Sequence, residues 1–182
     1  MIELQRCSDK EQWDEYVLEH GGHPLQLWSW GQVKSGHGWV AERVFAYDED
    51  KVVGAAQVLI RRLPLPLRAF AYIPRGPLAE DEYKDEFLDK LAVLVKRDHH
   101  AVALSIEPDT TAFEKPEGWV RATNKVLSAE TIMLDTTKSE SDLLADMAKK
   151  TRQYIRKSGA DVKIRQIKKR EDIEECLKIY QQ

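Results

Sequence analysis

Cysteine is scarce in this 182-residue sequence, and the two that occur, Cys7 and Cys176, lie near opposite ends. Their spacing fits neither a disulfide framework nor a set of metal ligands. Long uncharged apolar runs are also missing, because a stretch such as residues 52–60 is too short to span a bilayer. The first ten residues lack the apolar segment of a signal peptide. We therefore expect a cytoplasmic protein without a metal centre, whose membrane contact is at most peripheral.

Charge is unevenly distributed along the chain. The formal net charge is −3, and hydrophobic residues make up 42% of the sequence, as in a globular protein. Residues 149–170 nevertheless hold ten basic side chains and one acidic one, Asp161. A block of this kind is typical of a surface that meets phosphate groups, although a solvated helix face is the simpler interpretation.

Apolar periodicity predicts alternating strands and helices. The expected strands are residues 2–6, 39–47, 52–60, 70–73, 101–106, 131–134 and 162–167. The first expected helix begins after an N-cap at Ser8 and ends at Gly21. Further helices are expected over residues 25–35, 81–98, 139–157 and 171–180. This order is typical of an α+β fold of the GNAT acyltransferase kind, a mixed sheet flanked by helices.

The last part of the pattern repeats the opening of the chain. A strand and a helix follow the basic segment, as they open the chain. We therefore assign residues 1–158 to a first GNAT-like domain that includes a basic linker helix. Residues 159–182 are assigned to the start of a second, similar domain, and we expect this sequence to be part of a longer protein.

The glycine-rich turn that binds the pyrophosphate of acetyl-CoA is also missing. In an acetyl-CoA-dependent domain, backbone N–H groups at a helix N-terminus hold this group. Here the turn after the strand at residues 70–73 reads PRGPL. Because two prolines remove two donors, a GNAT-type acyl-CoA transferase acting on a small amine is the less favoured function.

Several short motifs occur in one order along the chain. Residues 24–30 read PLQLWSW, followed by Lys34 and the pair Gly38-Trp39. Further blocks read YIPRGP at 72–77, LSIEP at 104–108, TIMLD at 131–135, LLADM at 143–147 and KTRQYIRK at 150–157. Together they resemble the Fem-type (FemABX) aminoacyltransferases, which build the cross-bridge of bacterial peptidoglycan.

The resemblance implies a function, its partners and some of its binding residues. Members of this family transfer an amino acid from aminoacyl-tRNA to the stem-peptide amine of a lipid-linked or nucleotide-linked muropeptide, without another cofactor. The position of Lys34 matches a lysine that contacts the muropeptide diphosphate, and Tyr72 and Arg75 would line the same cleft. From the residues alone, Lys34 follows an apolar helix beside glycines, where it could bind a phosphate or simply be exposed.

A catalytic group is harder to assign from the sequence. Attack of an amine on an aminoacyl ester needs positioning, a proton acceptor and stabilisation of the oxyanion. Glu107 is the candidate acceptor among the side chains, and groups of the substrate itself are the alternative. A carboxylate at a strand end also suits a structural role as a hydrogen-bond acceptor.

The basic helix has an apolar stripe and a charged face. The stripe, which includes Leu143, Met147 and Ile155, is expected to contact a core. Lys150, Arg152 and Arg156 are the candidate phosphate-binding residues of this segment, for tRNA, a muropeptide diphosphate or an anionic leaflet. A non-catalytic module that binds RNA or an anionic surface is therefore a further alternative.

Overall fold

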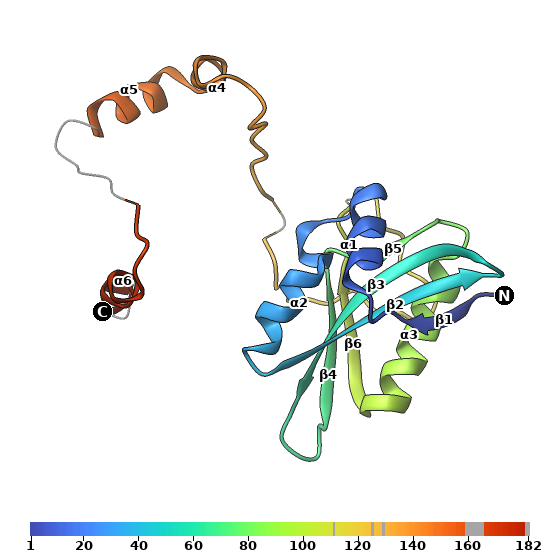
Figure 1. Cartoon of the computed structure of the whole chain (residues 1–182). Helices are drawn as coiled ribbons and strands as arrows, with labels where there is room; N and C mark the ends of the chain where they lie inside the picture. Colours follow the sequence, from blue (N-terminus) through green and yellow to red (C-terminus); the bar gives the residue numbers. More distant parts are fainter. Residues whose placement is uncertain (111, 125, 129, 159–165, 181–182) are drawn as a thin grey trace. The chain divides into compact units, whose positions relative to one another are not determined.

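The structure is a computed structural model that describes residues 1–182 except 111, 125, 129, 159–165 and 181–182 (Figure 1). The chain divides into two compact units, Met1–Ala129 and Glu130–Gln182. We call them unit 1 and unit 2 and describe each by itself. The predicted domain boundary lies after residue 158, whereas this division groups the basic helix with the C-terminal residues. The assignment of residues 159–182 to a second GNAT-like domain stays a prediction.

Unit 1 is built on one mixed sheet. Its strands are β1 (Glu3–Arg6), β2 (Trp39–Asp48), β3 (Lys51–Arg62), β4 (Ala69–Pro74), β5 (Leu78–Ala79) and β6 (Ala101–Glu107). The strand order is β1-β2-β3-β4-β6, and β5 pairs with β3. All pairs are antiparallel except β4 and β6, which run parallel. The predicted mixed α/β architecture is thus confirmed.

Helices cover both faces of this sheet. They are α1 (Lys10–Glu19), the 3-10 helix η1 (Pro24–Gln26), α2 (Trp28–Ser35) and α3 (Lys84–His99). Val44 and Ala46 of β2 pack in one buried cluster with Leu91 of α3. Phe45, between them, packs with Trp13 of α1 on the opposite face. Strand alternation therefore sorts the core into two layers of apolar side chains.

Two local predictions in unit 1 are corrected. The N-cap of α1 is Asp9 instead of Ser8, because the Asp9 carboxylate accepts hydrogen bonds from the N–H groups of Glu11 and Gln12. The segment predicted as one helix over residues 25–35 consists of η1 and α2. Leu27 separates them in an extended conformation.

Unit 2 contains α4 (Glu140–Asp146), α5 (Lys149–Ser158) and α6 (Arg170–Tyr180). The helix predicted over 139–157 is interrupted at Met147, whose backbone is extended, and Ser139 is its N-cap. Residues 131–134 form no strand, and Ile132 and Met133 are exposed. The strand expected at 162–167 falls mostly on residues that the structure does not describe, and residues 166 and 167 have no regular structure.

Candidate functional site

The candidate site lies where the two parallel strands end. The register of β4 and β6 pairs Tyr72 with Ser105 and Pro74 with Glu107. Since side chains alternate along a strand, Tyr72 and Glu107 project from the same face of the sheet. The crossover through α3 thus brings together two residues that the sequence separates by 35 positions.

Glu107 is held by three hydrogen-bond donors. The Tyr72 hydroxyl donates to Oε2 at 2.7 Å, and the Leu127 N–H donates to the same oxygen at 3.0 Å. The Val126 N–H donates to Oε1 at 2.6 Å. Both carboxylate oxygens therefore anchor a loop segment to the strand end, which is the structural role that the sequence left open beside the catalytic one.

Tyr72 is a neutral donor in this arrangement. Burial, and then its hydrogen bond to the Glu107 carboxylate, raise the pKa of the Tyr72 phenol far above its usual value near 10. The phenol therefore keeps its proton at physiological pH. The pair can orient a polar group of a ligand, but Tyr72 is a poor proton acceptor.

Arg75 follows directly after β4 in a left-handed conformation, with φ at 50°. This conformation costs an L-residue about 1–2 kcal/mol. Its Nη2 donates to the Ser128 carbonyl oxygen at 2.7 Å, and its Nη1 lies 3.5 Å from the Asp109 carboxylate. The guanidinium is thus fixed beside the loop segment that Glu107 anchors.

Arg75 also lines a cavity of about 220 Å³. The wall includes the acidic side chains of Asp81 and Asp109 and the basic side chain of Lys84. The Lys84 ammonium donates to the Glu114 carbonyl oxygen at 2.9 Å and lies 4.9 Å from the centre of the Phe113 ring. A hollow with charged groups of both signs suits a small polar or zwitterionic ligand.

The buried Gln26 side chain positions the end of β4, a role that its sequence motif alone did not indicate. The Gln26 side chain donates through Nε2 to the Pro74 carbonyl oxygen at 2.5 Å and accepts the Gln57 N–H at 2.8 Å. A Cβ atom on Gly76 would lie 2.9 Å from the Gln26 amide, so glycine is needed there. The PLQ motif and the PRGP motif therefore contact each other in the structure. The occurrence of both motifs in one sequence was the signal from which this contact could have been predicted.

Lys34 lies in the last turn of α2, on the same side of the sheet as Tyr72. Gly31 of that helix packs so closely on Ala41 of β2 that an added Cβ atom would contact it. Ala41 pairs with Leu59, which pairs with Tyr72, so these three residues share one face of the sheet. The Lys34 ammonium is 4.8 Å from the centre of the Trp30 ring. Among the described residues it has no carboxylate partner, so its charge remains available to a ligand.

The three basic candidates of unit 2 lie on α5. Arg152 donates through Nη1 to the carbonyl oxygens of Leu144, Ala145 and Met147, at the C-terminal end of α4. It therefore caps a helix, a role that the charge pattern did not reveal. Lys150 lies 5.7 Å from the Tyr154 ring centre, and Arg156 is exposed. The binding roles of these residues stay predictions.

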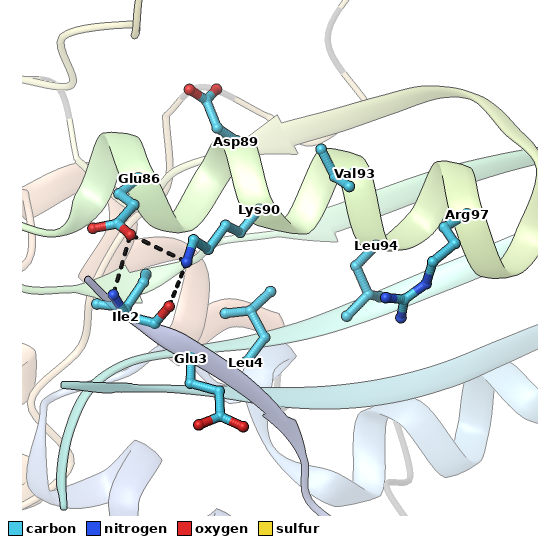
Figure 2. A pocket seen from close by; sticks show the side chains of 9 residues that line it. All are labelled: Ile2, Glu3, Leu4, Glu86, Asp89, Lys90, Val93, Leu94 and Arg97. Carbon is cyan, nitrogen blue, oxygen red and sulfur yellow. Dashed lines mark hydrogen bonds and ion pairs between the residues drawn. The ribbon is translucent and has the colours of Figure 1, made fainter. Parts of the chain in front are cut away.

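The larger hollow of unit 1, about 490 Å³, lies away from this cluster, between β1 and α3 (Figure 2). Glu86 accepts the Ile2 N–H at 3.1 Å, and Lys90 donates to the Ile2 carbonyl oxygen and lies 3.2 Å from Glu86. These side chains satisfy the main chain at the edge of the sheet, which protects the edge from pairing with another strand. We regard this hollow as structural because its charged groups bind the protein itself.

The residues that the structure describes contain no cluster of three or more histidine, cysteine, aspartate or glutamate side chains suited to a metal ion. None of their helices combines the length and the apolar character needed to cross a bilayer.

Comparisons with known proteins identify relatives of this chain. The lipid II:glycine glycyltransferase of Staphylococcus saprophyticus is 32% identical over 99 residues, which is 53% of this chain and 24% of that protein. The Staphylococcus aureus protein of the same name is 30% identical over 112 residues, 59% of this chain and 26% of that protein. The chain thus matches about a quarter of the length of these relatives.

The fold and a family model agree with these relatives. The crystal structure of FemX matches with a TM-score of 0.70 at 22% identity, over 94% of this chain and 47% of that one, which shows a common fold. The model of the FemAB family matches residues 9–125. The resemblance drawn from the motifs is confirmed, and the chain belongs to the FemAB family.

Proposed function

We propose that the protein containing this chain is an aminoacyltransferase. It would transfer an amino acid from aminoacyl-tRNA to the stem-peptide amine of a peptidoglycan precursor, on the cytoplasmic side of the membrane and without a further cofactor. The observation that carries this proposal is the FemAB family match over residues 9–125, together with relatives named lipid II:glycine glycyltransferase.

The geometry of unit 1 supports a binding role for the strand-end cluster. Arg75 is fixed by Asp109 and Ser128 at the wall of a cavity with charges of both signs. Lys34 offers a cation on the same side of the sheet, as a point charge suited to a diphosphate. We assign Lys34, Tyr72 and Arg75 to the precursor.

The proposed chemistry needs mainly positioning. The acceptor amine attacks the ester carbonyl carbon, a C–N bond forms, and the ester C–O bond breaks. The amine proton moves to the released ribose oxygen, directly or through an acceptor. Holding the two substrates in an attack geometry supplies much of the rate enhancement of such a step.

Glu107 can serve this step in two ways that a conservative substitution separates. If Glu107 only anchors the loop at 126–127, Glu107→Gln keeps one acceptor oxygen and lowers the transfer rate less than about tenfold. If it is the proton acceptor, the loss is about 100-fold or more. The three donors on its oxygens favour the smaller effect.

The direct test is a transfer assay with the intact protein. Charged tRNAs are supplied with a lipid-linked or a nucleotide-linked muropeptide, and the amino acid incorporated into the acceptor is measured. Transfer that Lys34→Ala and Arg75→Ala reduce while thermal unfolding is unchanged supports the proposal. Absence of transfer across a panel of charged tRNAs and both acceptors contradicts it.

An acetyl-CoA titration provides the discriminating control. From Pro74, the last residue of β4, the chain passes through Pro77 to β5, which pairs with β3, and α3 begins only at Lys84. This path places no helix N-terminus directly after the strand. We therefore expect acetyl-CoA to leave the thermal unfolding temperature unchanged, and a clear rise would favour the acyl-CoA alternative.

A further inference from the structure

The hairpin that joins β3 to β4 carries an exposed apolar tip. Residues 63–67 read LPLPL, and of these Leu65 is 83% and Leu67 is 52% exposed. In Figure 1 the tip extends beyond the end of α3, away from the sheet. Leu65 and Leu67 belong to neither buried cluster of unit 1, and exposed apolar runs are typical of interaction sites.

The tip has a defined shape. The Leu63 N–H donates to the Arg68 carbonyl oxygen at 2.8 Å, and the Leu67 N–H donates to the Pro64 carbonyl oxygen at 3.0 Å. Two prolines further limit the conformations of this turn. The leucines are therefore presented without a large loss of conformational entropy on binding.

Basic and aromatic side chains surround the tip. Arg61, Arg62 and Arg68 flank it, all are exposed, and none pairs with a carboxylate among the described residues. No acidic residue occurs between Asp50 and Glu80 in the sequence. The Arg61 guanidinium lies 5.5 Å from the centre of the half-buried Trp39 ring.

This combination has a specific physical meaning. Leucines suit the acyl boundary of a bilayer, arginines suit anionic headgroups, and tryptophan is enriched at the interface between them. A protein partner would be expected to supply carboxylates for the arginines, whereas an anionic lipid surface supplies phosphates everywhere. We infer that the β3–β4 hairpin tip docks on an anionic lipid bilayer, with Leu65 and Leu67 inserted and Arg62 and Arg68 on the headgroups.

Docking on a bilayer favours a lipid-linked acceptor over a nucleotide-linked one. In this respect the inference rests on the proposed function. Its physical test is independent. Co-sedimentation of the intact protein with vesicles is carried out without tRNA or muropeptide. Loss of vesicle binding would therefore contradict the docking proposal alone, and loss of amino acid transfer would contradict the transfer proposal alone.

The first experiment changes the apolar tip. Vesicles of equal parts phosphatidylglycerol and phosphatidylcholine should bind the protein, and Leu65→Ser combined with Leu67→Ser should lower the partition coefficient about tenfold. The matched control is Leu18→Ser combined with Val120→Ser, which are 66% and 88% exposed elsewhere in unit 1. The control should bind like the unchanged protein, and both pairs should retain its thermal unfolding temperature.

The second experiment changes the charge. Arg62→Gln combined with Arg68→Asn should lower binding to the anionic vesicles about tenfold and leave the weak binding to pure phosphatidylcholine unchanged. Asparagine is chosen because Arg68 has φ at 57°, a conformation that asparagine tolerates. Lys115→Gln combined with Arg121→Gln, in the loop after the far end of β6, is the matched control and should have no effect.

Three results would overturn the docking proposal. The unchanged protein could fail to sediment with anionic vesicles. The leucine pair could bind as well as the unchanged protein, which would move the membrane contact to another surface such as α5. Loss of a copurifying protein, instead of vesicle binding, on changing the leucines would identify a protein interface.

Discussion

Unit 1 and unit 2 are both amphipathic in sequence, but among the residues that the structure describes only those of unit 1 form a buried apolar core. Leu91 of α3 is fully buried against the sheet, together with residues from four strands. In unit 2, Ile173 and Leu177 of α6 are 50% and 53% exposed, and α4 and α5 contain no buried residue. The apolar stripe expected to contact a core is thus solvent-accessible in the described part of the chain.

The difference shows what a helical pattern alone can specify. Amphipathic periodicity gives each segment its helix, but the stability of a helix in a protein comes mainly from packing on another element. Unit 1 provides that element as a sheet with two apolar faces. The described residues of unit 2 form three helices and no strand, so we expect these helices to be stabilised mostly by local interactions.

The largest expected contrast comes from the same substitution in the two units. Leu91→Ala should lower the free energy of unfolding of unit 1 by about 2–5 kcal/mol, because it leaves a cavity in a closed core. Leu177→Ala should change the stability by less than about 0.5 kcal/mol, because its side chain is half exposed.

Urea unfolding can be followed separately in each unit. All five tryptophans precede residue 129, so their fluorescence reports on unit 1, and hydrogen exchange of residues 170–178 reports on α6. A loss of several kcal/mol on Leu177→Ala would show that α6 is packed in the intact protein. The contrast between the two units would then be wrong.

A smaller effect is expected from the buried amide that joins η1 to the strand ends. Gln26→Ala leaves the Gln57 N–H and the Pro74 carbonyl oxygen without their partner, which should cost about 2–4 kcal/mol. Gln32→Ala, exposed on α2, is the control and should stay within about 0.5 kcal/mol. Equal unfolding midpoints for the two variants would mean that water replaces the Gln26 amide.

The regular parts of the fold could be predicted because their patterns are local. Alternation located β2, β3, β4 and β6 within a few residues, and the apolar face of α3 located that helix. The segment 131–134 has the composition of a strand, but no strand among the described residues pairs with it. Strand propensity depends on such partners, so the sequence alone could not decide this case.

Within the candidate site, only the contact between residues on strands could be predicted. Tyr72 and Glu107 meet because β4 and β6 are parallel, which the order of elements implies. The contacts of Arg75 with Asp109 and with the loop at 128 depend on an irregular segment that has no periodicity. The capping role of Arg152 was missed because a basic residue on a helix surface looks the same whether it faces solvent or a neighbouring carbonyl group.

Arg152 and Arg156 allow the local stabilisation of unit 2 to be tested. Arg152→Gln removes the donor to the last carbonyl groups of α4 and should destabilise that helix by about 0.5–1 kcal/mol. Hydrogen exchange of residues 140–147 should then be faster, whereas Arg156→Gln should leave it unchanged. If both variants also weaken tRNA binding, the effect of Arg156→Gln can be assigned to a phosphate contact. The effect of Arg152→Gln cannot, because that substitution also changes α4. Unchanged exchange in Arg152→Gln would contradict the capping role.

The smallest effect is a pH dependence confined to unit 1. Burial of the Tyr16 phenol between its own helix and the sheet, with the nearby charge of Glu80, raises its pKa to about 12, compared with about 10 in an unfolded chain. Between these values the unfolded chain binds fewer protons than the folded one, so the free energy of unfolding falls as the pH rises. Because Tyr16 is half-buried, its share of that loss should be below about 1 kcal/mol.

Tyr16→Phe isolates this contribution. Urea unfolding, followed by tryptophan fluorescence at pH 9 and pH 11, should show a shallower loss of stability in the variant than in the unchanged protein. Ionisation of lysines cancels in that comparison. Tyr154→Phe in unit 2 is the control, since its side chain is 60% exposed and lies outside the unit that the tryptophans report. An equal loss in all three proteins would show that the Tyr16 phenol is hydrated in the folded state. The core on the α1 side of the sheet would then be more open than the α3 side.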